Sequence, residues 1–346
     1  MSKPVRIKDI AIKAGVSAGT VDRVLHQRGE VKKETREKIM AIAKELNYKP
    51  NVAARILKAP VVYRIAVLLP VPVNEKSFWT KHPVGIANAV ESISPYNVEP
   101  VFYQFHIQDG DDFNKQTRAI IKNRPDGIIM APLHRQESIA FCKQLDEIKI
   151  PYIFIDTNID ATNCLSYIGE DAVKSGRIAA SLIDVMMPVV KDVLIVNIAK
   201  SLVNAQHLNS RNQGFLTYFN EAGRNQGLKI SVDIPADDEK TVSGKLDHIF
   251  STNKNIGGIL VSGARTYVIA RYLKASNLNK VLIGYESIGE NVEYLNEGVI
   301  DFLVSQRPVE QAEKAMHLLI DAIVNKADHP KEVIQPIDIV NKESLV

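Results

Sequence analysis

The hydrophobic pattern of this chain changes its period near Pro60, and this change limits the folds that the chain can adopt. Before Pro60, apolar residues recur every three or four positions, which is typical of amphipathic helices. After Pro60, apolar residues form continuous runs that suit strands buried on both faces of a parallel sheet. The sequence therefore predicts a small all-helical head followed by a much larger body of strands and helices.

Three helices are expected in the head. The first covers Ile7 to Ala14 and ends at Gly15, and the second begins after Ser17, an N-cap residue type. The third runs from about Lys33 to Leu46. A further segment, Asn51–Lys58, has only eight residues, and isolated helices shorter than ~12–15 residues are marginal in water.

The body is predicted to alternate strands with helices over some 280 residues. Expected strands are Ile65–Leu69, Ile128–Ala131, Tyr152–Ile155, Val193–Ile198, Ile256–Val261 and Val281–Gly284. Expected helices are Phe113–Lys122, Ser138–Ile148, Ala172–Met187, Gln213–Ala222 and Val309–Asn325. This alternation indicates an α/β fold with right-handed crossovers. At this length, two smaller doubly wound parallel sheets are favoured over one open sheet of nine or more strands.

The formal net charge of +3 conceals an uneven distribution. Residues 1–60 carry a net charge of +8, whereas the remaining residues carry −5. A basic head on a mildly acidic body indicates that the head meets a polyanion and that the body does not.

Several other classes of protein are disfavoured by composition. The longest apolar run, Ile65 to Val73, is about half of the ~20 residues that a membrane span needs. Charges begin at Lys3, so no signal peptide is expected and the predicted location is the cytoplasm. Cys142 and Cys164 predict two reduced structural thiols, and the scattered histidines predict neither a metal site nor a cofactor.

The first two helices and their tight turn form a candidate helix-turn-helix. With Val21, Val24 and Leu25 buried, the second helix directs five residues outward, namely Ala18, Gly19, Asp22, Arg23 and His26. Arg23 can donate two hydrogen bonds to guanine, and Ala18 can contact a thymine methyl group. Ser17, Thr20 and Lys32 are interpreted as phosphate contacts.

The segment IKDIAIKAGVSAGTVDRVLHQRGEVKKETREKIMAIAKELNYKPNVAARILK resembles the DNA-binding head of the lac-repressor/purine-repressor (LacI) family. The motifs that match are Asp9–Ser17, Thr20–Leu25, Thr35–Ile39 and Leu46–Asn51. The resemblance implies that residues 51–58 form a hinge helix, with Leu57 wedged between base pairs of the minor groove. The expected DNA-binding residues are Arg6, Ser17, Ala18, Gly19, Thr20, Arg23, His26, Lys32, Thr35, Tyr48, Asn51, Ala54 and Leu57.

The head departs from the family pattern at two places. Ala18 and Gly19 are smaller than the polar pair often used there to read bases, so readout is expected to rest more on Arg23 and DNA shape. Asp22 stands where the family commonly has Ser, and an acid near phosphates is unfavourable unless it pairs with Arg23 or a base amine. These departures leave the operator sequence open.

In the body, open α/β sheets bind ligands beyond the carboxyl ends of their strands. Loop residues at those positions combine aromatic rings with planar polar groups, a chemistry that suits the C–H faces and hydroxyls of a sugar. Arg211 is expected to open a helix after the fifth strand. The candidate effector-binding residues are Phe78, Trp79, Asp156, Asn158, Arg211, Arg265, Glu286 and Gln306.

The body resembles the type-1 periplasmic-binding-protein fold, in its ribose-binding-like branch. Three motifs match in the order of the family: Tyr167–Ala180, Arg211–Phe215 and Gln306–Pro308. The resemblance implies that Arg211 and Asp156 are the best ligand contacts. Glu286 replaces the usual Asp, and Gly263-Ala264 replaces a common Asn-Asp pair, which leaves the identity of the ligand open.

Two local patterns suggest chemistry that their context disfavours. Gly15–Gly19 matches the G-x-S-x-G nucleophile elbow, but it lies between two helices and not after a strand, so no enzymatic activity is expected. Asp109–Asp112 is interpreted as a turn with a helix N-cap rather than a metal site.

These observations predict a ligand-controlled transcriptional regulator, a repressor that binds a pseudo-palindromic operator as a homodimer and senses a small carbohydrate. The predicted domains are a helix-turn-helix at 1–49, a hinge at 50–61 and an effector-binding and dimerisation domain at 62–346. A nucleobase effector and a sugar-binding protein without a regulatory role are the alternatives. The choice between inducer and corepressor stays open.

Overall fold

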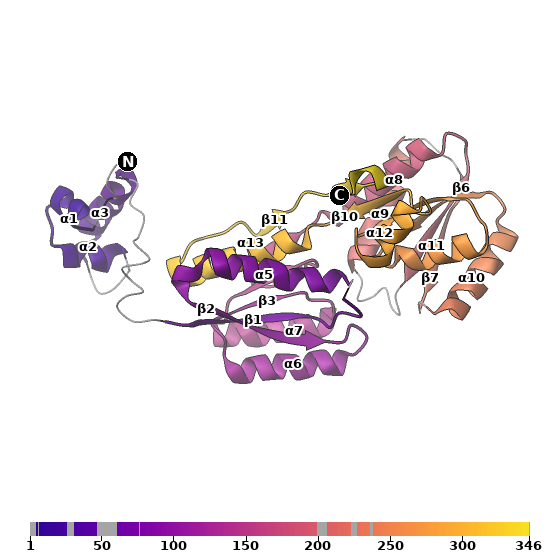
Figure 1. The fold of residues 1–346 in the computed structure, drawn as a ribbon. Helices are drawn as coiled ribbons and strands as arrows, with labels where there is room; N and C mark the ends of the chain where they lie inside the picture. Colours follow the sequence, from indigo (N-terminus) through magenta and orange to yellow (C-terminus); the bar gives the residue numbers. More distant parts are fainter. Residues whose placement is uncertain are drawn as a thin grey trace. The chain divides into compact units, whose positions relative to one another are not determined.

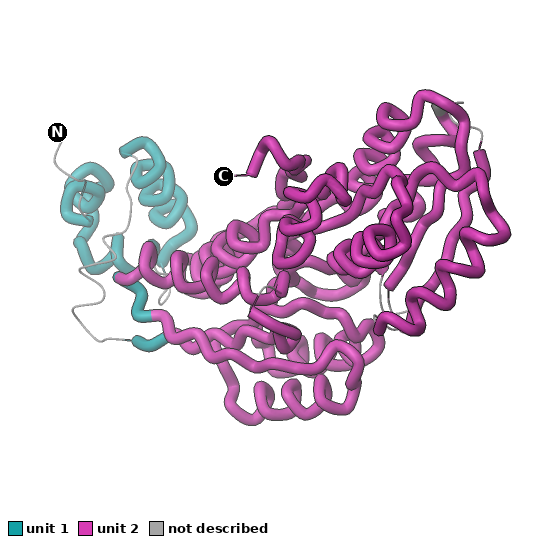
Figure 2. Tube along the Cα trace, turned by 45° about the vertical axis from the view of Figure 1, so that its right-hand side comes forward, with its two compact units in different colours: residues 1–62, 95–97 teal, residues 63–94, 98–346 magenta. Residues whose placement is uncertain are grey.

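A computed structural model describes residues 5, 7–25, 31–46, 61–75, 77–198, 206–222, 227–235 and 238–345. The chain divides into two units (Figure 2). Unit 1 contains residues 1–62 and 95–97, and unit 2 contains the remainder. Within the described ranges, no helix combines the length and apolar character needed to cross a membrane.

The head folds as three helices around a small apolar core. They are α1 (Ile7–Ala14), α2 (Ala18–Leu25) and α3 (Lys33–Glu45). The core residues are Ile10, Ala11, Ala14, Val21, Val24, Ile39, Ile42 and Ala43. Gly15 ends the first helix with a φ of +70°, a conformation that costs glycine little, and the hydroxyl of Ser17 accepts the backbone N–H of Thr20 as an N-cap.

The body contains two six-stranded sheets, which we call lobe one and lobe two. In lobe one the strand order is β11-β5-β4-β3-β1-β2, and all neighbouring strands pair in parallel. The strands are β1 (Tyr63–Pro70), β2 (Val98–Phe105), β3 (Gly127–Met130), β4 (Tyr152–Ile155), β5 (Tyr167–Gly169) and β11 (Glu332–Ile334). The sheet is covered by α5 (Lys81–Ser92) and α13 (Pro308–Asn325) on one face, and by α6 (Gly110–Asn123) and α7 (Arg135–Ile148) on the other (Figure 1).

Lobe two repeats this arrangement with the strand order β12-β10-β9-β8-β6-β7. The strands are β6 (Asp192–Ile198), β7 (Lys229–Ile234), β8 (Ile256–Val261), β9 (Val281–Tyr285), β10 (Phe302–Ser305) and β12 (Asp338–Val340). One core packs α8 (Ala172–Met186) and α9 (Gln206–Ala222) on the sheet. The other packs α10 (Glu239–Thr252), α11 (Thr266–Ala275) and α12 (Gly289–Asn296) on its opposite face. The prediction of two parallel sheets is confirmed, and β12 adds one antiparallel edge strand to lobe two.

The chain passes between the lobes at three crossover segments, residues 169–172, 305–308 and 334–338. The first and third are joined by a hydrogen bond from Gln335 N to Gly169 O at 2.8 Å. The second and third are joined by Arg307, whose guanidinium contacts both carboxylate oxygens of Asp338 at 2.9 and 2.7 Å. The three segments are therefore held together by hydrogen bonds, and we call them the lobe crossover.

Helices α8 and α9 approach each other closely through two glycines. A Cβ atom on Gly176 would lie 1.9 Å from Arg211 O, and one on Gly214 would lie 1.9 Å from Val173 O. Any larger residue at these positions would separate the helices. The motifs Tyr167–Ala180 and Arg211–Phe215 each contribute one of these glycines, so this contact explains part of their pattern.

Candidate functional site

The body contains a cavity of about 500 Å³ at the carboxyl ends of the strands of both sheets. Lobe one contributes residues that follow β1, β2, β3 and β4, and lobe two contributes residues that follow β6, β8, β9 and β10. Parallel strands that end together bring these loops to one edge of each sheet, as expected for open α/β folds. The cavity is therefore where the sequence predicted it.

Most of the predicted effector-binding residues lie around this cavity. Its lining includes Phe78, Trp79, Asp156, Arg211, Arg265, Glu286 and Gln306. Asn158 is not among the lining residues, and its Nδ2 lies 3.4 Å from Glu332 Oε1. The positive φ of Asp156 (+65°) turns the backbone immediately after β4, which explains why two residues so near in sequence have different surroundings.

Phe78 and Trp79 form the aromatic part of the cavity wall. They lie in a short 3₁₀ helix, η1 (Phe78–Thr80), with their rings edge to face and the centroids 5.1 Å apart. The Trp79 ring stacks on His82, with centroids 4.9 Å apart and an interplanar angle of 22°. Burial lowers the pKa of His82 to about 3, so this imidazole is neutral. The stack therefore adds no charge behind the aromatic wall.

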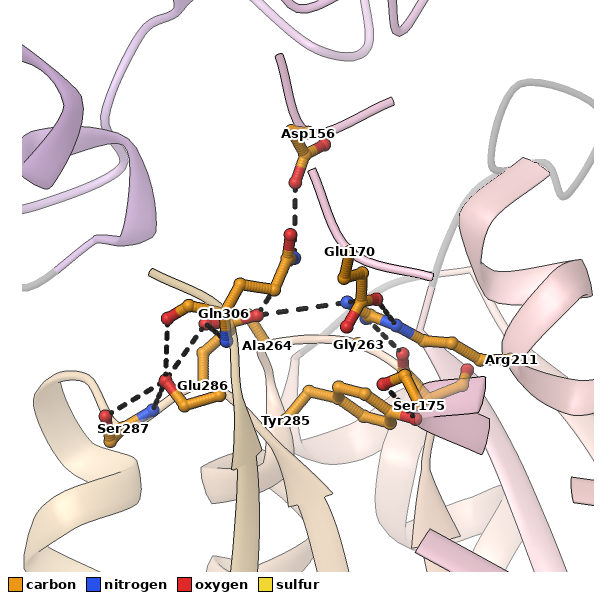
Figure 3. A network of polar contacts seen from close by, with 12 residues as sticks. Asp156, Glu170, Ser175, Arg211, Gly263, Ala264, Tyr285, Glu286, Ser287 and Gln306 are labelled. Atoms are coloured by element: carbon orange, nitrogen blue, oxygen red, sulfur yellow. Dashed lines mark hydrogen bonds and ion pairs between the residues drawn. The ribbon is translucent and has the colours of Figure 1, made fainter. Parts of the chain in front are cut away.

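Arg211 lines the cavity and takes part in a network of polar contacts (Figure 3). Its Nε donates to Glu170 Oε1 at 2.7 Å, and its Nη1 donates to the backbone oxygen of Ser262 at 2.8 Å. The guanidinium carbon lies 3.8 Å from the centroid of the Tyr285 ring, a cation–π contact. Burial opposes the charge, but Glu170 raises the pKa of Arg211 above its usual value, so the guanidinium remains charged.

The expectation that Arg211 opens its helix is wrong. Helix α9 begins at Gln206, which places Arg211 in the second turn. Ser210 has the chemistry of an N-cap, but Leu208, before it, is 5% exposed and provides an apolar anchor for an earlier start. The side chain of Arg211 is therefore fixed by a helix that continues on both sides of it.

Sequence reasoning did not select Glu170, the ion-pair partner of Arg211. Its side chain is buried, and Arg211 Nη2 also lies 2.6 Å from its Oε1. Glu170 directly follows β5, so the rule that identified Asp156 after β4 would also have identified it. Because Glu170 lies in the first crossover segment, the ion pair links Arg211 directly to the lobe crossover.

Gln306 joins two buried carboxyl groups from different lobes. Its Nε2 lies 3.4 Å from Asp156 Oδ1 and 3.1 Å from Glu286 Oε1 (Figure 3). Burial raises the pKa of Glu286 to about 8 and also raises the pKa of Asp156, while Arg211 opposes both shifts. The cavity thus contains two carboxyl groups whose charged forms are destabilised by burial.

Two buried polar atoms of the cavity lining, His134 Nε2 and His207 Nδ1, have no hydrogen-bond partner within the described residues. Beside the lining, Glu170 Oε2 has none either, whereas Arg211 Nη2 lies 2.6 Å from Glu170 Oε1. Unpaired buried polar atoms are costly, and a bound ligand with hydroxyl groups can satisfy both donors and acceptors. No group of three His, Cys, Asp or Glu residues in the described ranges is arranged to hold a metal ion.

In the head, the structure describes only part of the predicted DNA-binding set. Ala18, Gly19, Arg23 and Lys32 are exposed, while Thr20 and Thr35 are half-buried. The hydroxyl of Ser17 caps α2 and lies 2.9 Å from Thr20 Oγ1, and Arg23 Nε donates to Gly19 O at 3.2 Å. The other predicted contacts lie outside the described residues: Arg6, His26, Tyr48, Asn51, Ala54 and Leu57.

Two family models match the chain. The model of the bacterial regulatory proteins of the lacI family matches residues 6–51, and the model of a periplasmic binding protein domain matches residues 65–327. The HTH-type transcriptional regulator RegA of Clostridium saccharobutylicum is 27% identical and aligns over 98% of this chain and 99% of its own. The ribose operon repressor of Lactococcus lactis is 23% identical, over 98% of this chain and 97% of its own.

Solved structures agree with this assignment. A putative LacI transcriptional regulator from Bacteroides fragilis matches with a TM-score of 0.73 and 28% identity, over 82% of this chain and 98% of that one. The glucose-galactose binding protein GanP of Geobacillus stearothermophilus shares the fold, with a TM-score of 0.70 and 20% identity over 82% of this chain and 99% of that one. The chain therefore belongs to the lacI family of bacterial regulatory proteins and has a periplasmic binding protein domain as its body.

Proposed function

We propose that this protein is a ligand-controlled repressor of a sugar-utilisation operon. The observation that carries the proposal is the presence, in one chain, of a helix-turn-helix with an exposed Arg23 and of a polar, aromatic-walled cavity of about 500 Å³. A cavity of this size is in the range used for small molecules. The proposed activity is binding rather than catalysis, and the proposed location of the protein is the cytoplasm.

The proposed organisation has a DNA-binding domain at residues 1–49, a hinge at 50–61 and an effector-binding and dimerisation domain at 62–346. Two copies of the chain would place two recognition helices on half-sites about one helical turn apart. The operator is then a pseudo-palindrome, because a two-fold symmetric dimer reads the two half-sites in opposite directions. The net charge of +8 in the first 60 residues supports contact with phosphates.

A small carbohydrate is the proposed effector. Phe78 and Trp79 offer aromatic surface, and Arg211, Asp156 and Gln306 offer fixed polar groups in the same cavity. This combination suits the apolar face and the vicinal hydroxyls of a sugar ring. Relatives named as ribose and sucrose operon repressors are consistent with the same ligand class.

The lobe crossover provides a route from the cavity to the DNA. Glu170 and Gln306 lie on two of the three crossover segments, and their side chains hold Arg211, Asp156 and Glu286. A ligand that binds these groups would change how the lobes close and hence the state of the hinge segment at 50–61. Control of this kind is a coupling free energy, so operator DNA must change the effector affinity by the same factor.

DNA binding is tested with a pseudo-palindromic fragment selected from random sequence. We expect affinity to fall steeply with salt concentration, because each phosphate contact releases counterions. Arg23→Ala should lose base discrimination of about 1–3 kcal/mol at one position of each half-site, while Arg36→Ala, on an exposed part of α3, should preserve the sequence preference. An operator affinity that does not change with salt concentration, or a selection that yields no palindromic sequence, contradicts the proposal.

The role of Leu57 is tested separately, since this residue lies outside the described ranges. Leu57→Ala should preserve the fold and weaken operator binding, because a minor-groove wedge trades unstacking for contact. DNA bending is measured by circular-permutation electrophoresis or energy transfer. Unchanged affinity together with unchanged bending would refute the wedge.

Effector binding is tested by a thermal-shift screen over pentoses, hexoses, polyols and nucleobases, because a ligand that binds the folded state raises Tm. The ligand that raises Tm should also change operator affinity, and the sign of that change separates an inducer from a corepressor. Arg211→Lys preserves the charge beside Glu170 but removes the planar donor fork, so it should respond weakly. A full response by this variant would exclude Arg211 as a ligand contact.

A further inference from the structure

The charges around the cavity are unbalanced. Four acidic residues line it, namely Glu137, Asp156, Glu286 and Glu290, against two arginines, Arg211 and Arg265. Arg265, Glu137 and Glu290 are all half-buried, so solvent screens their charges alike, and Glu290 pairs with Arg271 at 2.6 Å. The arginine that matters for a buried ligand is therefore Arg211, whose side chain is only 3% exposed.

The charge of Arg211 is already compensated. Glu170 Oε1 lies 2.6 Å from its Nη2 and 2.7 Å from its Nε, and Glu286 Oε1 lies 3.8 Å from Nη2. Its Nη1 is directed at the backbone oxygen of Ser262. Arg211 can therefore donate a hydrogen bond to a ligand, but it cannot supply the net positive charge that an anion needs.

Helix N-termini are the other common site for anions, and at this cavity α9 and α11 begin without an acidic side chain in their first turn, whereas α6, α7 and α12 each carry one. Helix α6 begins beside the lining residue Gly110, where Asp109 Oδ1 accepts the backbone N–H groups of Asp111 and Asp112 at 3.0 Å. Helix α7 has Glu137 in its first turn, and α12 has Glu290. The positive ends of the α6, α7 and α12 dipoles are thus neutralised by the chain itself.

The buried carboxyl groups make an anion still less favourable. Asp156 Oδ1 and Glu286 Oε1 both lie within 3.4 Å of one nitrogen, Gln306 Nε2, so the two acids are near each other in a site of low solvent content. Histidine does not offset them at His207, where burial lowers the pKa to about 3 and leaves the ring neutral. A phosphate or a ligand carboxylate would place its charge beside these two carboxyl groups, where neither His207 nor the paired Arg211 compensates it.

We propose that the cavity selects a polyhydroxylated ligand that has no anionic group, and that it rejects the phosphorylated and carboxylated forms of the same sugar. The inference rests on the proposed sugar effector and specifies its charge. Ligand donors, either hydroxyl or ammonium, would bind Asp156 and Glu286, which line the cavity. Ligand oxygens would accept from the guanidinium of Arg211, whose Nη2 already lies 2.6 Å from Glu170 Oε1.

The chain contains a reporter for this test, because Trp79 is its only tryptophan and lines the cavity. We would measure Trp79 fluorescence and Tm of the full chain with matched pairs of probes. The pairs are ribose with ribose 5-phosphate, glucose with glucose 6-phosphate, and galactose with galacturonate. Glucosamine, compared with glucose, distinguishes an ammonium donor from a hydroxyl donor.

The expected result is that at least one neutral sugar or amino sugar binds, at least tenfold more tightly than its anionic counterpart. An anionic probe that binds as tightly as its neutral counterpart, or more tightly, overturns the inference and leaves the sugar effector standing. If no probe in an enlarged panel of sugars binds, the proposed effector is wrong and the inference falls with it.

Variants at the acidic pair provide an independent check. Asp156→Asn removes one carboxyl group while preserving its shape, so it should narrow the difference between neutral and anionic probes by about tenfold. Glu286→Gln should have the same effect when binding is measured above pH 8, where the carboxyl group of Glu286 is charged. Glu343→Gln, at an exposed carboxylate outside the cavity, is the matched control and should change nothing. Unfolding curves establish that each variant is folded, and unchanged discrimination in both cavity variants contradicts the inference.

Discussion

The two lobes of the body share a topology but contribute different chemistry to the cavity. Lobe one supplies two aromatic rings of the wall, Phe78 and Trp79, while aliphatic side chains come from both lobes. Lobe two supplies both arginines, together with Glu286. Lobe one thus offers the larger aromatic surface and lobe two offers the guanidinium donors, so a ligand satisfies both only when it lies between them.

Beneath this difference, equivalent strands carry equivalent features. Asp156 follows β4 and Glu286 follows β9, the third strand from the same edge of each sheet, and their φ angles are +65° and +70°. Glu170 follows β5 and Gln306 follows β10, in the two crossover segments. The shared backbone places a polar side chain at each position, and the residue type then decides which lobe carries charge.

The largest effect should come from removing the charge that lobe two holds at its centre. Arg211→Ala leaves Glu170 as a buried, unpaired carboxylate, and the free energy of unfolding should fall by about 3–5 kcal/mol in urea titrations followed by circular dichroism. Arg211→Met combined with Glu170→Gln should recover most of that loss. Arg271→Ala, which breaks the partly exposed pair with Glu290, is the control and should cost under about 1 kcal/mol. A loss as small as the control in Arg211→Ala would show that the ion pair is not a structural centre of lobe two.

If the two lobes tolerate substitution equally, adding a Cβ atom at the closest helix contact of each lobe should lower the free energy of unfolding by a similar amount. A Cβ on Gly85 of α5 would lie 2.0 Å from Val309 O in lobe one, and one on Gly176 would lie 1.9 Å from Arg211 O in lobe two. Gly85→Ala and Gly176→Ala should each cost about 1–3 kcal/mol of unfolding free energy. Gly244→Ala in α10, where no atom lies within 4 Å, should instead stabilise by about 0.5–1 kcal/mol.

These glycine variants also separate scaffold from site. Gly176→Ala displaces the backbone of Arg211 and should weaken effector binding, whereas Gly85→Ala should destabilise lobe one with a smaller effect on affinity. Equal losses of affinity in the two variants would contradict the division of chemistry between the lobes. Calorimetric titration of each variant with the effector provides the measurement.

The pH dependence of the free energy of unfolding should report the protonation of Glu286 in lobe two. In the folded chain burial raises the pKa of Glu286 from 4.5 to about 8, so between these values the folded state binds more protons than the unfolded state. The free energy of unfolding should therefore fall as pH rises from about 5 to 8, by up to about 1.4 kcal/mol per pH unit. Glu286→Gln should flatten this slope, and an unchanged slope in that variant would assign the effect to another group.

The smallest effect should come from lobe one. Trp79→Leu should weaken effector binding by about 0.5–1.5 kcal/mol, because it removes an aromatic face, and Trp79→Phe should preserve most of the affinity. Calorimetry measures both, since these variants lack the fluorescent reporter. If Trp79→Leu binds as well as the original chain, lobe one contributes shape alone.

The long central strands were predictable from the sequence, whereas the edge strands and the short inner strands β5 and β10 were not. The run Ile65–Leu69 lies within β1, whose last six residues are buried, as its continuous apolar pattern indicated. In contrast β2 and β7 are outer strands with exposed and half-buried residues mixed along them, so their sequences lack a continuous run. The short strands β11 and β12 gain their structure from the neighbouring strand more than from their own three residues.

The cavity was predictable to the level of the loop but not of the side chain. The rule that ligands lie beyond strand ends placed Asp156, Glu286 and Gln306 correctly at the cavity, because parallel strands end together. It did not exclude Asn158, whose surroundings depend on the turn at Asp156. The sequence also does not reveal that Glu170 and Arg211 pair, because these residues lie in different segments and meet only in the folded body.

The crossover segments make each lobe discontinuous along the chain. Lobe one is completed by α13 and β11, which are synthesised only after nearly all of lobe two, and α13 packs against α5, β3 and β4. The head, in contrast, is built from neighbouring helices, and N-terminal domains fold first during synthesis. Translation that ends before Pro308 would therefore leave a chain whose head can fold while its cavity cannot form.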